Sequence, residues 1–287
     1  MDINYIPLAT AFIGTIIAAI WDLKTTEVPD QLPYIMIGIG LLFYGYQSII
    51  EMSIWPIANS LIYGLAFLGF GGFMYYMGQW GGADAFILSA LGFLLPVAPL
   101  GFTNTIFQFP ISYFINVFLV GSVYMLLYAV VFALKNKRIF SDFYMGMKAN
   151  SRMILASSLV TLIVFFVASL ITTQLIYQSL DIMKALLYSL YPFVSVALIY
   201  AVLKFVKAVE IHGFKRQIPI SQLKVGDMLL SERKLIGVTK EDIKTLRKSG
   251  KKYVDIKLGV PFAVAFPVAL LVTLLYGDLI LFLVKLI

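Results

Sequence analysis

Long apolar segments dominate this chain and limit what it can fold into. The sequence of 287 residues is 61% hydrophobic and only 13% charged, whereas about a quarter of the residues in soluble domains are charged. A run of about 20 apolar residues can cross a bilayer as a helix. About eight such runs are present, at residues 3–20, 32–50, 55–77, 85–100, 107–134, 153–171, 185–203 and 260–281. The chain is therefore predicted to be an all-α polytopic membrane protein with about eight transmembrane helices.

The basic residues predict how these helices are oriented. Lysine and arginine collect on the cytosolic side of membrane proteins. With the amino terminus outside, all 22 basic residues lie inside except Lys184 and Lys285. The reversed topology would place nearly all of them outside, so the first orientation is expected.

The net charge of +7 follows from this topology. Basic residues on the inner side attract anionic lipid head groups, so membrane lipids are expected partners and nucleic acid is not. The start, "MDINYIPL", lacks the basic stretch of a cleavable signal peptide. The first apolar run is therefore expected to remain in the mature protein, in the cytoplasmic membrane.

The hydrophilic segments suggest a division of the chain. Residues 1–134 are predicted to form a transmembrane core, and residues 135–203 a cytosolic basic loop with two further transmembrane helices. Residues 204–258 are predicted to form a small α/β cytosolic domain, and residues 259–287 contain the last transmembrane helix.

The small domain carries local signals for both helix and strand. Thr239 with Asp242 is typical of a helix start, and Gly250 of a helix end. The short runs "DMLL" and "YVDIK" favour strands on either side. His212 has no partner cluster in the sequence and is expected to be solvated. The chain contains no cysteine, which excludes thiolate metal sites and a cysteine nucleophile, and no cofactor or metal is expected.

Two aspartates are predicted to lie at the same membrane face. In "GQWGGADAFILSALGFLL" a glycine-rich stretch leads into Asp84, at the start of an apolar run. Asp22 follows the first run, and two further crossings separate it from Asp84, so both fall on the cytosolic side. Two neighbouring carboxylates share a proton. The ionised one can then activate water while the protonated one polarises a carbonyl.

Each of these residues also has a structural interpretation. Acids at helix starts often act as N-caps, which would suit Asp84 and Asp30. Acids just outside a membrane helix are often solvated, which would suit Asp22 and Glu27. Glycines such as Gly81 and Gly82 often permit close helix packing.

Two local patterns resemble a known family. "GGAD", from Gly81 to Asp84, is similar to the GxGD motif of intramembrane aspartic proteases, with alanine in place of the second glycine. "WDLKTTEVPD" resembles the segment around the first aspartate of the type IV prepilin peptidase and archaeal preflagellin peptidase family. The final "KLGVPFAVAFPVALLVTLLYG" resembles the last helix of that family.

The resemblance implies a membrane aspartic endopeptidase. Such enzymes remove the short basic leader from prepilin-like or preflagellin (archaellin) precursors at the cytosolic face. Carried over by position, Asp22 and Asp84 become the catalytic pair. Gly81 and Gly82 become a flexible connection that lets the helix after them approach its neighbours. Glu27 and Asp30, beside Asp22, form an acidic patch suited to the basic residues of a leader.

Departures from the family narrow this expectation. The larger bacterial members insert a four-cysteine domain between the first two helices and also methylate the new amino terminus, whereas this chain has no cysteine. The resemblance therefore implies a peptidase without methyltransferase activity, closer to the archaeal branch. The precursor, whether flagellin, pilin or another subunit, stays open. The alternatives are a presenilin-like intramembrane protease and a transporter. A transporter would place ionisable residues near the middle of the membrane. The only acid near the interior of an apolar run is Asp278, which is expected at the outer interface.

Overall fold

The protein is a mostly helical polytopic membrane protein. The computed structural model describes residues 5–99, 106–178, 181–213, 215–229, 237–250, 252–257 and 259–286. Within these ranges, the helices long and apolar enough to cross a membrane are α1 (Ile6–Thr25), α2 (Gln31–Ile50), α3 (Trp55–Tyr76), α5 (Phe109–Lys135), α6 (Lys137–Tyr177) and α7 (Ile182–Gly213). Two shorter apolar helices are α4 (Gly82–Leu94) and α9 (Ala265–Tyr276). The predicted helical membrane class is confirmed, and the number of crossings stays a prediction.

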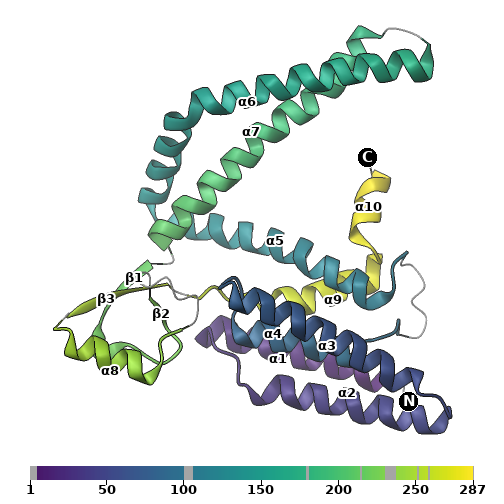
Figure 1. The fold of residues 1–287 in the computed structure, drawn as a ribbon, viewed down its shortest axis with the longest axis vertical. Coiled ribbons are helices and arrows are strands. Elements are labelled where there is room, and N and C mark those ends of the chain that lie inside the picture. The colour runs from purple at the N-terminus through teal and green to yellow at the C-terminus, as the bar shows by residue number, and fades with distance from the viewer. Residues whose placement is uncertain are drawn as a thin grey trace. The chain divides into compact units, whose positions relative to one another are not determined.

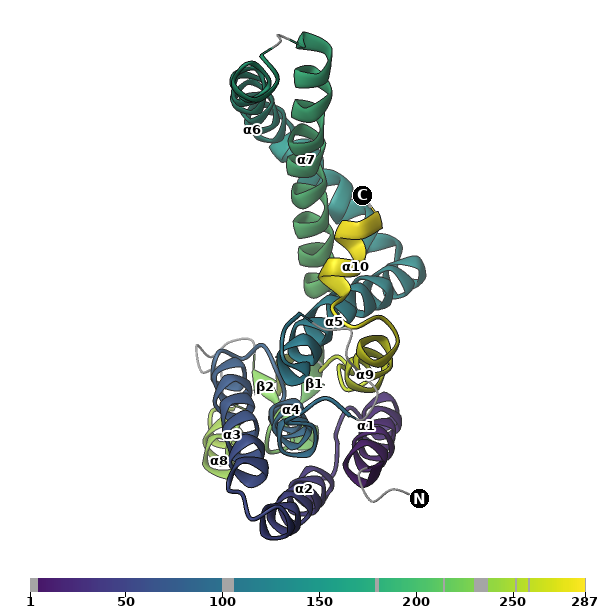
Figure 2. The same ribbon diagram turned by 90° about the vertical axis from the view of Figure 1, so that its right-hand side faces the viewer.

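The chain forms two compact units, and the boundary between them falls within α5. The first unit comprises Met1–Met125 with Arg216–Ile287, and the second Leu126–Lys215. In the first unit α4 is the central helix, with α1, α2 and α3 packed around it (Figures 1 and 2). Every residue from Ile87 to Leu94 is buried. This burial explains why a helix of only 13 residues is so apolar.

Small residues let α4 approach its neighbours closely. A Cβ on Gly92 would lie 2.6 Å from the Tyr63 carbonyl oxygen, and one on Gly71 would lie 2.7 Å from the Ala85 Cα. Such close backbone approach is typical of membrane helix interfaces. These glycines therefore serve packing in the middle of the bundle.

Side chains of α2 and α3 satisfy carbonyl groups at the end of α4. The Ser60 hydroxyl donates to the Phe93 carbonyl at 2.7 Å, and the Tyr44 hydroxyl donates to the Leu94 carbonyl at 3.1 Å. The last carbonyls of a helix have no partner within it, and an unsatisfied buried carbonyl is costly. These bonds hold the carboxyl end of α4 in place.

The predicted last transmembrane segment is interrupted. Helix α9 ends before Gly277, whose φ of 68° is favourable for glycine, and α10 (Leu279–Leu286) follows. Asn116 of α5 donates to the Thr273 hydroxyl at 2.9 Å and to the Gly277 carbonyl at 2.8 Å, so it holds this junction. Asp278 is buried in the protein, and one of its oxygens accepts the Ile106 N–H.

A small sheet lies at one end of the helices of the first unit (Figure 1). Its strands β1 (Lys215–Pro219), β2 (Met228–Leu229) and β3 (Tyr253–Lys257) are ordered β1-β3-β2. Strand β2 is antiparallel to β3, with Met228 opposite Lys257. The sheet and α8 (Lys240–Lys248) share an apolar cluster, formed by Ile218, Ile220, Leu223, Leu229, Val238, Ile243, Val254 and Ile256.

The predicted helix signals of this region are confirmed. The Asp242 N–H donates to the Thr239 hydroxyl at 3.2 Å, and Asp242 in turn accepts the Thr239 N–H at 2.9 Å. Gly250 follows α8 with a φ of 72°, as a residue ending a helix often does. Helix α7 continues to Gly213, so residues 204–213 belong to it.

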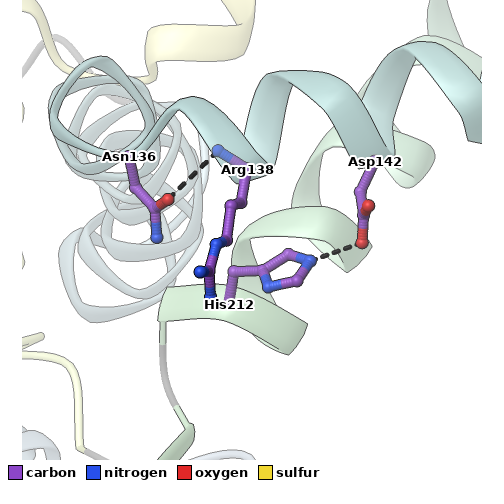
Figure 3. A network of polar contacts seen from close by, with 4 residues as sticks. All are labelled: Asn136, Arg138, Asp142 and His212. Atoms are coloured by element: carbon purple, nitrogen blue, oxygen red, sulfur yellow. Dashed lines mark hydrogen bonds and ion pairs between the residues drawn. The ribbon is translucent and has the colours of Figure 1, made fainter.

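The second unit is a hairpin of α6 and α7, which pack against each other. Residues 137–152 were predicted as part of a basic loop, and this prediction is wrong because they form the first turns of α6. Asn136 caps this helix by accepting the Arg138 N–H at 3.1 Å (Figure 3). His212 was predicted to be solvated and unpaired, but it contacts Asp142 across the hairpin (Figure 3). The pairing depends on helix packing that sequence spacing does not reveal.

Candidate active site

Asp22 lies in the last turn of α1 and is buried, with 7% of its surface exposed. Its Oδ2 accepts the Ala263 N–H at 2.8 Å. Ala263 belongs to the turn before α9, in which the Ala265 N–H donates to the Phe262 carbonyl. The Ala263 N–H precedes the helix and is free to donate to a side chain. Residues far apart in the sequence therefore meet at this carboxylate.

Asp84 lies in the first turn of α4 and is half-buried. Its Oδ2 accepts the Gly81 N–H at 3.1 Å. A carboxylate in the first turn also interacts favourably with the helix dipole. The structural interpretation of Asp84, as a residue that stabilises the helix start, therefore applies, and it does not prevent a second role.

The packing of α1 against α4 and α9 brings the two carboxylates into one region. They are close enough for their charges to interact. Each is hydrogen-bonded to a backbone N–H, and no hydrogen bond joins the two. Between them they offer acceptors and, once one is protonated, a donor, which is what acid–base catalysis needs.

Aromatic side chains surround the backbone that holds the carboxylates. The Trp80 ring is buried and stacks on the Phe118 ring of α5, with centroids 5.5 Å apart. It also contacts the Phe262 ring, with centroids 5.4 Å apart. Trp80 directly precedes Gly81, and Phe262 directly precedes Ala263. Trp80 and Phe262 were not predicted as site residues, although a tryptophan directly before Gly81 was a visible signal.

The other predicted site residues lie on the surface or in open positions. Glu27 and Asp30 are exposed in the connection between α1 and α2. Asp30 is the N-cap of α2 but makes no side-chain cap hydrogen bond. Gly81 has the extended backbone angles φ −72° and ψ 157°, and a Cβ on Gly82 would meet only the Tyr75 ring, at 3.7 Å. Neither glycine adopts a conformation that only glycine favours.

The described residues provide no group of three or more histidine or acidic side chains placed to hold a metal ion. Among the same residues, neither aspartate forms an ion pair with lysine, arginine or histidine. The carboxylates of Asp22 and Asp84 are the two acidic groups that this region brings together.

These features define a polytopic membrane protein in which two helices bring a pair of carboxylates together. Residues 9–135, which contain both aspartates, match the model of the Type IV leader peptidase family. This part of the chain is similar to that family.

Two proteins of known identity are similar to the chain. Prepilin peptidase EppA of Methanothermobacter thermautotrophicus is 25% identical, and the comparison covers 100% of this chain and 98% of the relative. The preflagellin peptidase of Methanocaldococcus jannaschii is 36% identical over 36% of this chain and 48% of the relative. The first similarity therefore extends over the sheet, the hairpin and the last helices as well.

Proposed function

We propose that the protein is a membrane aspartic endopeptidase of the GxGD type that removes the leader peptide of prepilin-like or preflagellin precursors. The observation that carries this proposal is the meeting of Asp22 and Asp84 at the ends of α1 and α4. The family match over residues 9–135 supports the peptidase activity, and the names of both relatives support these precursor classes. No methyltransferase activity is expected.

The pair performs hydrolysis by general acid–base catalysis. The ionised carboxylate takes a proton from water as the water oxygen attacks the scissile carbonyl carbon. The protonated carboxyl donates to the carbonyl oxygen, so a neutral tetrahedral intermediate forms. Collapse of this intermediate breaks the C–N bond. The carboxyl that took the water proton gives it to the leaving amine, and the other carboxylate takes a proton from a hydroxyl of the intermediate. The pair then returns to its shared-proton state.

The site is proposed to face the cytosol. The six long helices together with α4 and α9 would supply the eight predicted crossings. With the amino terminus outside, the carboxyl end of α1 and the amino end of α4 both reach the inner side. The sheet would then project into the cytosol, where its basic residues and those of α6 lie beside anionic lipid head groups.

The connection between α1 and α2 is proposed to receive the leader. Glu27 and Asp30 are exposed and lie a few residues after Asp22. Exposed carboxylates can form charge-assisted hydrogen bonds with lysine or arginine of a precursor. Gly81 and Gly82 lie next to Asp84 at the start of α4, and their lack of a side chain is proposed to leave room for an extended peptide.

The decisive experiment is cleavage of precursors by membranes that contain the protein. Asp22→Asn and Asp84→Asn should each abolish leader removal from a panel of prepilin-like and preflagellin precursors, because an amide cannot exchange protons in this way. Glu51→Gln, which changes an exposed carboxyl group at the end of α2, is the matched control and should retain activity. Full activity in either of the first two variants, at equal membrane levels, would overturn the aspartic mechanism.

A further inference from the structure

We infer that Trp80 and Phe262 are positioning residues that set the separation of the two carboxylates. This inference rests on the proposed function. Each ring is directly followed in the chain by the residue whose N–H holds one carboxylate: Gly81 donates to Asp84, and Ala263 donates to Asp22. The contact between the rings therefore links the two halves of the site.

The contacts of Trp80 fix the first half. Trp80 is 8% exposed, and its ring lies nearly parallel to the Phe118 ring, with an interplanar angle of 15°. Phe70 of α3 meets the same indole edge-on at 6.0 Å. A large aromatic side chain held on several sides has little rotational freedom. Because Trp80 directly precedes Gly81, the fixed indole restrains the position of the Gly81 N–H.

The contacts of Phe262 fix the second half. A Cβ on Gly121 of α5 would lie 2.7 Å from Cε2 of the Phe262 ring, so this ring lies directly against the α5 backbone. Phe266 of α9 packs edge-on to Phe262 at 5.7 Å. Helix α5 thus supports both rings, Trp80 through Phe118 and Phe262 through Gly121.

The consequence is a fixed spacing between groups that must exchange protons. Catalytic groups displaced by about 1 Å can lose about two orders of magnitude in rate. The difference between the two apparent pKa values of an interacting pair also depends on its separation, because charge repulsion weakens with distance. The aromatic link should therefore affect both kcat and the pH range of activity.

Two independent perturbations test this link. Trp80→Leu removes one ring, and Gly121→Ala displaces Phe262 while leaving every aromatic side chain present. The matched controls are Phe67→Leu, which removes a buried ring from the same apolar cluster, and Gly69→Ala, which adds a methyl group where nothing lies within 4 Å. Membrane level and thermal melting in detergent are measured for all four variants.

The expected result is a fall in kcat of about tenfold or more for Trp80→Leu and Gly121→Ala, with KM changed less than threefold. Their pH–rate profiles should also become narrower. Weaker charge repulsion between the two carboxylates brings their apparent pKa values closer, and the acid and alkaline limbs of the profile then lie closer together. Both controls should keep the parent kcat and profile width, even if they melt earlier. If Trp80→Leu fails to accumulate, the Gly121→Ala result alone decides.

The inference and the proposed function can fail separately. If Asp22→Asn and Asp84→Asn are inactive but Trp80→Leu and Gly121→Ala behave like Phe67→Leu and Gly69→Ala, only the positioning role is overturned. If the two asparagine variants are fully active, the aspartic mechanism itself is overturned.

Discussion

Removal of the Ala263 N–H should move the acid limb of the pH–rate profile to higher pH. Ala263→Pro deletes the donor that Asp22 accepts at 2.8 Å, and it keeps the carbonyl that accepts the Phe266 N–H. A hydrogen bond to a buried charged group contributes about 1.5–3 kcal/mol. Since 1.36 kcal/mol corresponds to one pKa unit, the limb should move by about one to two pH units. The direction is upward, because the lost bond stabilised the ionised carboxylate, which then becomes protonated at higher pH.

The measurement is leader removal at saturating precursor in detergent or in membranes, across the pH range in which the protein stays folded. Ala263→Gly is the matched control, since it keeps the N–H and removes only a methyl group, and its acid limb should stay in place. A folded Ala263→Pro protein with an unmoved acid limb would refute the view that this bond stabilises the ionised state used in catalysis.

Three further predictions concern separate parts of the chain. Gly81→Ala places a Cβ 3.3 Å from the neighbouring carboxylate oxygen and should lower kcat about tenfold, whereas Gly82→Ala, which meets only an ordinary ring contact, should leave it unchanged. Glu27→Lys should raise KM for basic leaders at low salt and lose this effect at high salt, because exposed charges are screened; an unchanged KM at low salt would refute a leader-binding role. Asn116→Ala should lower the free energy of unfolding by about 3 kcal/mol, because the buried polar groups that Asn116 binds lose their hydrogen-bond partner. Ser122→Ala, at an exposed position, should leave melting in detergent unchanged.

The carboxylate pair could be predicted from the sequence because its placement depends only on the number of membrane crossings and on a short local motif. The prediction that Asp22 and Asp84 share a membrane face came from counting crossings, and the surrounding residues resemble a motif. The Ala263 contact could not be predicted in the same way. Its donor is a backbone N–H, which every residue except proline possesses, so residue identity carries no signal for it.

Long-range packing limited the other predictions. The basic residues between Lys137 and Arg152 resembled a loop because their charge outweighs their apolar periodicity, yet the cap at Asn136 starts a helix there. The interruption at Gly277 was not predicted, because a single glycine in an apolar run costs only about 1 kcal/mol. The helix breaks at Gly277 because Asn116 donates to the Gly277 carbonyl, which would otherwise lack a partner.

The packing of α4 limits how far the carboxylates can move during a reaction. The sequence suggested that α4 itself approaches its neighbours, but this helix is already central and its carboxyl end is bound by Ser60 and Tyr44. Shifting it would break these bonds, at about 1 kcal/mol each, and would open close contacts such as that of Gly71 with Ala85. The Gly81 and Ala263 N–H groups also hold each carboxylate in its place. Water or substrate that lies between the two carboxylates can pass a proton from one to the other, so the helices keep their places and neither backbone bond is released.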